Sequence, residues 1–345
     1  MSSYNVGILG ATGAVGQQML ECLQERDFPV ADLRLFASAR SAGKTIEFKG
    51  EKVVIEEATP QCFKGCDIVL GAAGDDIAKE LLPHAVEAGA TVIDNSHAFR
   101  MDEDVPLVVP EINADHIAII DAQRRRLGTK RGFIAVKSNC SLQSYVPALH
   151  PLMKYGLDRA LVCTYQAISG AGKTFATWPE MVDNVIPYIG GEEEKSELEP
   201  LKLWGHIEGD KIVKAQGPSI TAQCFRVACQ DGHMAAVFMK FKDGHTPSME
   251  QIKADWAAFR GPAQELQLPS APKQFLHYFE EPDRPQTRLD RMLARGMAVS
   301  LGRLREDTQY DYKFVGLSHN TLRGAAGGAV LLAELLCANG YIQQM

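Results

Sequence analysis

A glycine-rich turn near the start of the chain constrains the fold more than any other feature. Residues 10–16 read Gly-Ala-Thr-Gly-Ala-Val-Gly. They follow an apolar run that predicts a strand, Val6–Leu9, and precede an amphipathic pattern that predicts a helix, Val15–Arg26. Glycine lets the backbone approach a phosphate closely, and a helix N-terminus offers free N–H groups to a pyrophosphate. We therefore expect a dinucleotide to contact the following residues: Gly10, Thr12, Gly13, Ala14, Val15 and Gly16.

The first third of the chain continues this alternation of strands and helices. Further strands are predicted at Leu33–Ala37, Ile68–Ala72 and Thr91–Ile93, with a helix over Asp76–Ala88. Strands that alternate with helices indicate βαβ units and a parallel sheet. The predicted fold class is α/β, with a Rossmann-type doubly wound parallel sheet.

The pattern changes after about residue 137. Longer alternating segments predict strands with one buried face, in a mixed or antiparallel sheet, at Arg159–Ile168, Ala222–Cys229 and Met234–Lys242. A helix is expected at Ser248–Phe259, a surface excursion at Gly261–Pro285 and a final helix at Thr321–Gly340. We predict a dinucleotide-binding Rossmann domain over residues 1–137, completed by the C-terminal helix at 320–345. Residues 138–319 would form a second, α+β domain with a mixed sheet.

Composition narrows the functional class. A net charge of −7 argues against a nucleic-acid partner, and the basic cluster Arg124–Arg126 is typical of a solvated loop or helix end. The longest apolar stretch, near Gly324–Ala338, is too short and Gly-rich for a membrane span, and the N-terminus does not resemble a signal peptide.

Eight cysteines in 345 residues do not form a disulfide framework. They predict free thiols in a reducing compartment, and hence a cytoplasmic protein. Cys62 and Cys66 have no second pair or nearby histidine, so no metal site is expected there.

The segment after the second strand bears on the choice of cofactor. An NAD site usually has an acidic residue here to bind the ribose hydroxyls. This chain instead has Ser38, Arg40 and Ser41, and a guanidinium group suits a 2′-phosphate. The sequence therefore favours NADP over NAD, although Arg40 could also form a surface ion pair.

Cys140 is the candidate nucleophile. It follows a predicted strand, Phe133–Val136, within the polar run Ser138–Ser141, and a helical stretch comes next. A cysteine at a helix N-terminus is stabilised as the thiolate, so we expect a lowered pKa for the Cys140 thiol.

Together these motifs resemble the aspartate-semialdehyde dehydrogenase family over nearly the whole chain. The second half is most similar to the archaeal and fungal branch. The matching stretches, in order, are Gly10–Gly16, Phe36–Lys44, Val92–Asn113, Ser138–Ser141, Tyr165–Gly172, Glu192–Gly205, Arg226–His233 and Ser318–Glu334.

The resemblance implies a role for each matching residue. Cys140 would be the nucleophile, His233 the acid/base and Gln166 the residue that orients the substrate. Arg226 would bind the substrate carboxylate and Glu199 its ammonium group. The phosphate contacts would be Arg100, Asn139 and Lys202. The residues beside the nicotinamide would be Ser169, Gly170, Gly172 and Asn320.

The implied reaction is the NADPH-dependent conversion of L-4-aspartyl phosphate to L-aspartate 4-semialdehyde through a thioester on Cys140. This reaction belongs to the biosynthesis of lysine, threonine, methionine and isoleucine. The implied partners are these small molecules, phosphate and further copies of the chain in a homodimer or homotetramer.

The chain departs from the family pattern at Ser138, Leu142, His97, Met234 and Ala235, which puts substrate identity in question. Three alternatives stay open. The first two are a malonyl-CoA reductase of related fold and a catalytically degenerate NADP-binding paralogue. The third, an N-acetylglutamyl-phosphate reductase, is disfavoured because its Gly-Cys-Tyr-type motif is absent.

Overall fold

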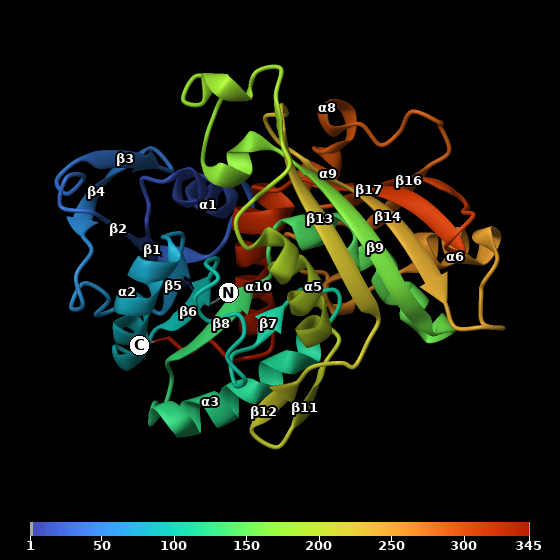
Figure 1. Cartoon of the computed structure of the whole chain (residues 1–345). Helices are drawn as coiled ribbons and strands as arrows, with labels where there is room; N and C mark the ends of the chain where they lie inside the picture. Colours follow the sequence, from blue (N-terminus) through green and yellow to red (C-terminus); the bar gives the residue numbers. More distant parts are fainter. Residues whose placement is uncertain (1–2, 345) are drawn as a thin grey trace.

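The structure, a computed structural model, describes residues 3–344, and within them two large sheets lie side by side (Figure 1). The first sheet has eight strands in the order β3-β4-β2-β1-β5-β6-β8-β7. Their bounds are β1 Tyr4–Leu9, β2 Val30–Ala37, β3 Thr45–Phe48, β4 Glu51–Glu57, β5 Ile68–Gly71, β6 Thr91–Asp94, β7 Leu107–Val108 and β8 Phe133–Lys137. All neighbouring pairs are parallel except β3 and β4, which confirms the predicted parallel sheet.

The chain order reverses at β1, which lies between β2 and β5. A dinucleotide binds at such a switch point, beyond the carboxyl ends of the strands. Gly10 follows β1 with φ +86°, and a Cβ there would lie 2.8 Å from the carbonyl oxygen of Ala72 after β5. The glycine therefore lets the turn pass close to its neighbour at the point where the sequence predicts phosphate binding.

The second sheet has seven strands in the order β10-β13-β9-β14-β17-β16-β15. Their bounds are β9 Leu157–Gln166, β10 Val185–Ile186, β13 Ser219–Val227, β14 His233–Phe241, β15 Leu276–Phe279, β16 Val299–Glu306 and β17 Tyr312–Ser318. It is mixed, as predicted, because β13 pairs with β9 in parallel and β14 pairs with β9 antiparallel. A separate hairpin joins β11 (His206–Glu208) and β12 (Lys211–Val213).

Helices cover both sheets. Their bounds are α1 Ala14–Glu25, α2 Asp75–Glu87, α3 Ile120–Leu127, α4 Val146–Leu149, α5 Glu192–Leu203, α6 Met249–Ala258, α7 Pro262–Glu265, α8 Thr287–Asp290, α9 Leu293–Gly296 and α10 Gly327–Ala338. The last helix, α10, is buried from Gly327 to Leu336 and packs on α1, β6 and β8 (Figure 1). A helix that is apolar on all sides must be enclosed, and α10 completes the core of the first sheet.

Two parts of the sequence prediction need correction. The strands β3 and β4 were not predicted, although their alternating residues flank a Lys49-Gly50 turn in which both φ angles are positive. The segment Gly261–Pro285 is not only a surface excursion. It contains α7 and the edge strand β15, and Phe275 and Leu276 are fully buried because β15 pairs with β16.

Two other expectations, on the basic cluster and on the cysteines, agree with the structure. The basic cluster Arg124–Arg126 forms the last turn of α3. All eight cysteines lie within the described residues and are free thiols. Across residues 3–344 no helix is both long and apolar enough to cross a membrane. The same residues hold no group of three or more His, Cys, Asp or Glu side chains suited to a metal ion.

His150 gives a prediction for stability against pH. Burial lowers the pKa of His150 to about 4, and its ring packs edge-on against Phe259 at 5.6 Å between centroids. Below about pH 6.5 the unfolded chain takes up a proton that the folded chain does not, so stability falls as the pH drops toward 4. We expect His150→Phe to remove about 2 kcal/mol of this loss at about pH 5.

Urea unfolding at about pH 7 and pH 5 measures this difference. His245→Phe, on an exposed loop, is the matched control. An equal loss of stability on acidification in the wild type and His150→Phe would contradict the prediction.

Candidate active site

A cavity of about 280 Å³ lies where the two sheets and the C-terminal helix meet. The predicted site residues that line it are Val15, Arg100, Asn139, Cys140, Ser169, Gly170 and Asn320. Val15 belongs to the dinucleotide-binding turn, whereas Ser169 and Gly170 follow β9 of the second sheet. The cavity thus joins the predicted cofactor turn to the predicted nucleophile.

Cys140 lies three residues after β8, at the start of the short 3₁₀ helix Ser141–Ser144. Its backbone is held by Asn139, whose side-chain oxygen accepts hydrogen bonds from the Ser141 amide at 2.8 Å and hydroxyl at 2.7 Å. Behind Cys140 lies Gly324, where a Cβ would be 2.8 Å from the Cys140 Cβ. The sulfur-bearing residue is therefore fixed from both sides.

The expected low pKa of Cys140 is not observed. Burial raises the pKa of the thiol, and the carboxylate of Glu192 raises it further, against the lowering effects of Lys137, Arg100 and Arg226. The helix that follows Cys140 spans one turn, so its dipole is weak. Neighbouring cations, rather than the helix, favour the thiolate.

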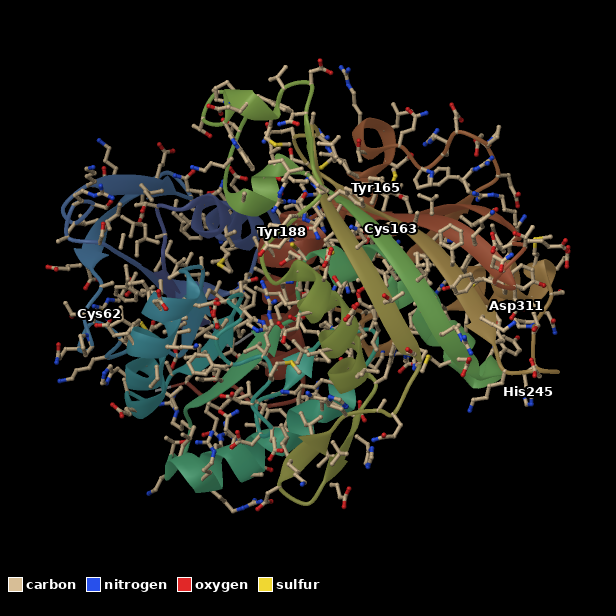
Figure 2. All side chains as sticks on the ribbon, viewed as in Figure 1. Cys62, Cys163, Tyr165, Tyr188, His245 and Asp311 are labelled. Atoms are coloured by element: carbon tan, nitrogen blue, oxygen red, sulfur yellow. The ribbon has the colours of Figure 1, made fainter. Side chains whose placement is uncertain are left out.

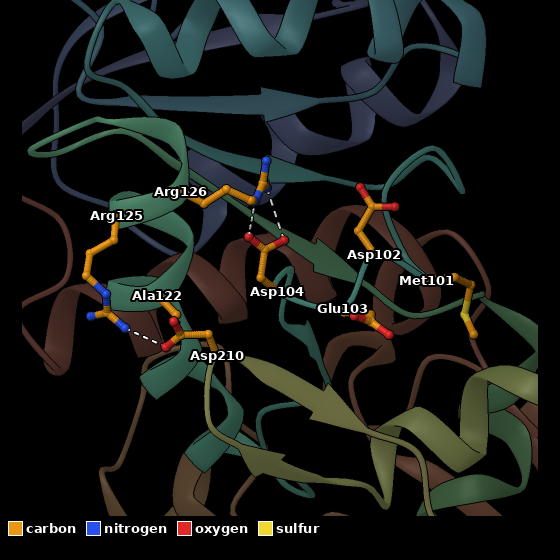
Figure 3. Close-up of a pocket in the computed structure, with 8 residues that line it drawn as sticks. All are labelled: Met101, Asp102, Glu103, Asp104, Ala122, Arg125, Arg126 and Asp210. Atoms are coloured by element: carbon orange, nitrogen blue, oxygen red, sulfur yellow. Dashed lines mark hydrogen bonds and ion pairs between the residues drawn. The ribbon is translucent and has the colours of Figure 1, made fainter.

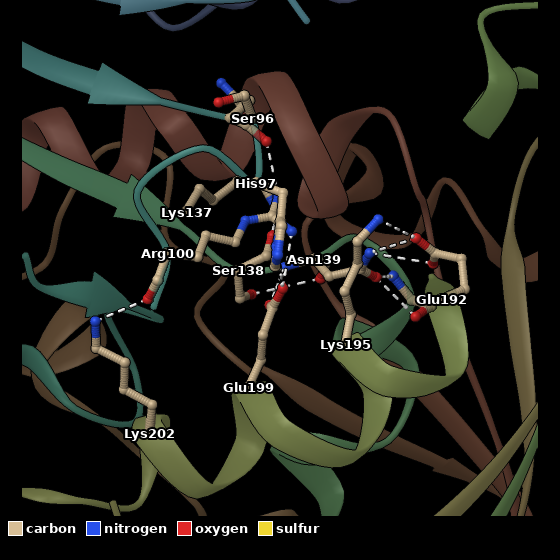
Figure 4. A network of polar contacts seen from close by, with 12 residues as sticks. Ser96, His97, Arg100, Lys137, Ser138, Asn139, Glu192, Lys195, Glu199 and Lys202 are labelled. Carbon is tan, nitrogen blue, oxygen red and sulfur yellow. Dashed lines mark hydrogen bonds and ion pairs between the residues drawn. The ribbon is translucent and has the colours of Figure 1, made fainter. Parts of the chain in front are cut away.

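Glu192 and Lys195, at the N-terminus of α5, line the cavity and were not predicted as site residues. The Glu192 carboxylate accepts a hydrogen bond from the side-chain amide of Asn139 at 2.9 Å (Figure 4). It also accepts one from the side-chain amide of Gln166 at 3.2 Å. The Lys195 ammonium lies 3.2 Å from Oε1 of this carboxylate, the oxygen that also accepts from Asn139. Gln166, itself buried, is thereby brought beside the nucleophile loop.

Glu199 and Lys202, which the resemblance makes substrate-binding residues, do not line this cavity. Glu199 is fully buried, and its oxygens accept hydrogen bonds from the Arg100 guanidinium at 2.9 Å and from the backbone N–H of Asn139 at 2.7 Å. Although burial alone would raise the pKa of Glu199, Arg100 and its other donors hold it below the usual value. This carboxylate is therefore already occupied.

The Lys202 ammonium donates to three backbone carbonyls, those of Arg100 at 2.7 Å, Asp102 at 2.6 Å and Val105 at 2.8 Å. Figure 4 shows it directed away from the cluster around Asn139. Burial lowers its pKa to about 8. All three ammonium hydrogens are thus used to fix the loop that carries Arg100.

A repeated pattern lies behind these two predictions. The spacing Glu-x-x-Lys occurs at Glu192–Lys195 and again at Glu199–Lys202 on the same helix. Seven residues are two helical turns, so the two pairs share one face about 10 Å apart. Sequence spacing cannot distinguish them, but the first pair lies beside the cavity and the second lies under the Arg100 loop.

Arg226 and Gln166 are register neighbours on β13 and β9, and both side chains point inward. One Arg226 nitrogen donates to the Ala167 carbonyl at 2.8 Å. His233, the first residue of β14, accepts a hydrogen bond at Nδ1 from the Ala167 amide at 3.1 Å. Gly170 lies against both side chains, because a Cβ there would be 2.8 Å from Arg226 and 3.0 Å from His233.

His233 is a neutral imidazole in this setting. Burial lowers its pKa well below 6.5, and the charge of Arg226 lowers it further. Since Nδ1 accepts from Ala167, the proton of the neutral ring lies on Nε2, which has no hydrogen-bond partner within the described residues. This buried, unpartnered nitrogen is suited to act on a bound molecule.

The remaining predicted residues flank the cavity. Asn320 donates to the Ser169 hydroxyl at 2.8 Å and accepts from the Gly232 amide at 2.7 Å, which joins three loops. Gly172 ends the short helix after β9 with φ +66° and does not line the cavity.

The predicted cofactor residues lie at the carboxyl ends of adjacent strands. Thr12, Gly13 and Ala14 complete the turn between β1 and α1. Ser38 and Arg40 are exposed in the turn after β2, and the Ser41 amide donates to the Ser38 carbonyl at 2.8 Å.

Of the five departures from the family pattern, His97 alone lines the cavity. Leu142 and Ala235 are fully buried in the core, and Ser138 accepts a hydrogen bond from Gln143 at 2.8 Å. Met234 points to the outer face of its strand. Most of these changes therefore lie outside the pocket wall.

A larger hollow, of about 880 Å³, lies elsewhere between α3 and the β11–β12 hairpin (Figure 3). Its charged groups pair with each other, Arg125 with Asp210 at 2.6 Å and Arg126 with Asp104. No cysteine or histidine lines it, and we do not assign it to the reaction.

A parallel sheet with a glycine-rich turn at its switch point, facing a cysteine across one cavity, defines a dinucleotide-binding dehydrogenase. Family models support this class. The NAD binding domain of semialdehyde dehydrogenases matches residues 5–120, and their dimerisation domain matches residues 149–323.

Individual proteins identify the family. The aspartate-semialdehyde dehydrogenase of Saccharomyces cerevisiae is 41% identical over 360 residues, covering 97% of this chain and 98% of the relative. That of Archaeoglobus fulgidus is also 41% identical, covering 96% and 98%. The solved structure of the Candida albicans enzyme with NADP has a TM-score of 0.88 at 37% identity, covering 98% of this chain and 100% of that chain. This chain belongs to the aspartate-semialdehyde dehydrogenase family, and the fungal and archaeal relatives agree with the predicted branch.

Proposed function

We propose that this chain is an NADP-dependent aspartate-semialdehyde dehydrogenase that converts L-4-aspartyl phosphate to L-aspartate 4-semialdehyde and phosphate. The observation that carries the proposal is the single cavity that collects Cys140, Arg100, Asn139, Glu192 and Lys195. The names of the relatives support this function over the malonyl-CoA reductase and degenerate-paralogue alternatives.

The residues of the first sheet fit a dinucleotide. Gly10 leaves room beside Ala72, and the N-terminus of α1 faces the cavity through Val15. The nicotinamide would lie near Ser169, Gly170 and Asn320. When bound, NADPH supplies the hydride for the reduction.

Three side chains would carry out the other steps of the reaction. The Cys140 thiolate attacks the acyl carbon and forms a thioester as phosphate leaves. His233, neutral and with a free Nε2, gives and takes the proton as the tetrahedral intermediates form and collapse. Gln166, the last residue of β9, donates to Glu192 and would orient the acyl group there.

The substrate's charged groups have matching partners. Arg226 has no carboxylate partner among the described ion pairs, and a planar guanidinium suits the α-carboxylate. We assign the α-ammonium group to Glu192 rather than to Glu199, because Glu192 lines the cavity. A cationic Arg226 and an anionic Glu192 match the carboxylate and the ammonium group of an amino acid, so they favour an amino-acid substrate over an acyl-CoA.

The two lysines of α5 should give different phenotypes. We assign phosphate binding to Arg100, Asn139 and Lys195, since Lys202 is fully hydrogen-bonded to carbonyls. Lys195→Met should raise the KM for phosphate about tenfold or more, with thermal stability retained. Lys202→Met should instead destabilise the fold by roughly 3 kcal/mol, because it leaves three buried carbonyls without donors.

Steady-state kinetics and urea unfolding of both variants make the comparison, and each variant is the control for the other. A specific loss of phosphate binding in a stable Lys202→Met protein would restore the original assignment.

Cofactor preference should depend on Arg40. Arg40 lies in the exposed turn after β2, and β2 pairs with β1, the strand that leads into the dinucleotide-binding turn. Arg40→Met should raise the KM for NADP about tenfold and leave the KM for NAD unchanged, because a 2′-phosphate contact is lost. An equal rise for both cofactors would show that Arg40 does not contact the 2′-phosphate. Initial rates with the two cofactors give the measurement.

The outer face of the second sheet supports a homodimer. Half-exposed apolar side chains cover it, and Tyr165 stacks on Phe225 at 5.9 Å between ring centroids (Figure 2). Tyr188, on the segment before α5, is 69% exposed. An apolar face of this kind marks a contact with another chain. Sedimentation of the purified chain distinguishes a dimer from a monomer or a tetramer.

The free thiols agree with a cytoplasmic location, which fractionation of the source cells would test.

The function itself is tested by phosphate-dependent reduction of NADP with aspartate semialdehyde as substrate. Parallel reactions contain NAD, or malonyl-CoA with NADPH. Turnover that requires phosphate supports the proposal. Turnover with malonyl-CoA alone would identify the chain as a malonyl-CoA reductase. NADPH binding without any turnover would identify a degenerate paralogue.

A further inference from the structure

Lys137 is a buried lysine in the wall of the reaction cavity. It is the last residue of β8, three residues before Cys140, and only 4% of its surface is exposed. It lines the same cavity as Cys140, Arg100 and Asn139. A buried ammonium group is costly unless the site uses its charge, so its presence here needs an explanation.

Two glycines of the C-terminal helical segment lie against Cys140 and Lys137. A Cβ at Gly324 would lie 2.8 Å from the Cys140 Cβ, and one at Gly328 would lie 3.1 Å from the Lys137 side chain. These glycines are four residues apart, which places them on one face of the segment. The same surface therefore seats both side chains.

Lys137 has one hydrogen-bond acceptor in the described chain, the carbonyl of Ser138. The neighbouring charges are engaged elsewhere, in the pairs Arg100 with Glu199, Lys195 with Glu192 and Arg323 with Glu111. Arg226 is assigned to the substrate carboxylate. Lys137 is left without an acid partner among the described residues.

The sulfur and the amine influence each other. Burial, and after it the charge of Arg100, lowers the pKa of Lys137 to about 7, although Cys140 and Glu199 oppose the shift. Among the groups that favour ionisation of Cys140, Lys137 has the largest effect, ahead of Arg100 and Arg226. Each group thus favours the charged form of the other.

We propose that Lys137 is a positioning residue of the reaction centre, whose ammonium group favours the thiolate of Cys140 over the thiol. Cys140 loses its proton to solvent while Lys137 stays protonated, so that an ammonium–thiol pair becomes an ammonium–thiolate pair with no other reactant required. The inference rests on the proposed role of Cys140 as nucleophile. In this proposal the Lys137 ammonium stabilises the Cys140 thiolate, an effect for which the one-turn helix after Cys140 is too short.

The pH dependence of Cys140 alkylation by iodoacetamide tests the proposal without any need for turnover. Mass spectrometry follows the peptide that contains Cys140. Lys137→Met removes the charge, and Lys137→Gln removes it but keeps a donor for the Ser138 carbonyl. Both should slow alkylation at pH about 7 by about tenfold or more, because the thiolate fraction falls. Lys137→Arg should restore part of the rate.

Lys154→Met, an exposed lysine paired with Asp255, is the matched control and should alkylate as the wild type does. Profiles for Lys137→Met and Lys137→Gln that superimpose on the wild type would overturn the proposal. If the wild type failed to reduce NADP with aspartate semialdehyde, the proposed function would fall, but the alkylation profiles would still decide the Lys137–Cys140 coupling.

A reciprocal measurement decides the matter if both uncharged variants fail to fold. Acetylation of Lys137 by acetic anhydride is followed against pH in the wild type and in Cys140→Ala. Loss of the thiolate should make Lys137 neutral at lower pH, so its acetylation at pH about 7 should be several-fold faster. Equal rates in the two proteins would overturn the proposal.

Discussion

Replacing Cys140 with alanine should reduce phosphate-dependent turnover of aspartate semialdehyde by about four orders of magnitude or more. The thioester cannot form without the sulfur, and no second cysteine lines the cavity. Alanine is smaller than cysteine and keeps the contact with Gly324, so the fold should be retained. Steady-state assays with NADP give the rate, and cofactor binding by fluorescence titration shows that the pocket persists.

Cys337→Ala is the matched control, because Cys337 lies near the end of α10 and does not line the cavity. It should retain wild-type turnover. Near wild-type activity in Cys140→Ser or Cys140→Ala would refute the covalent scheme.

The second large effect is expected at His233. In His233→Asn the amide can still accept the hydrogen bond from Ala167, but it cannot transfer a proton. The kcat should fall by about 10²–10⁴-fold, with little change in the KM for either substrate, because proton transfer acts in the transition state. Stopped-flow measurement of the first turnover separates this chemical step from product release.

His245→Asn, on the exposed loop after β14, is the control for His233 and should leave kcat unchanged. If His233→Asn raised KM and left kcat unchanged, His233 would be a binding group rather than an acid/base.

The parts of the fold that repeat a simple pattern could be predicted from the sequence. Strands β1, β5, β6 and β8 are continuous apolar runs because both faces of the first sheet are covered. Strands β9, β13 and β14 alternate because one face is covered and the other is partly open. The glycine-rich turn and the nucleophile loop carry their signals in contiguous residues, so their positions followed directly.

The errors arose where position depends on tertiary contacts. The choice between Glu192 and Glu199 could not be made from spacing, since both lie on one face of α5. The pKa of Cys140 depends on burial and on charges from four separate segments, which no local pattern encodes. Lys137 carries no motif and becomes noticeable only because its side chain is enclosed. The boundary near residue 137 stays a prediction.

The position of α10 has a consequence for the order of events during biosynthesis. All strands of the first sheet precede residue 138, but one of their apolar faces is covered by residues 327–336. While the ribosome is still making the second sheet, that face has no cover from its own chain. We infer that a nascent chain exposes this apolar face of the first sheet until α10 has been made. The docking of the C-terminal segment would also place Gly324 against Cys140. Stalled chains that end before residue 324 should therefore bind chaperones and lack a reactive pocket.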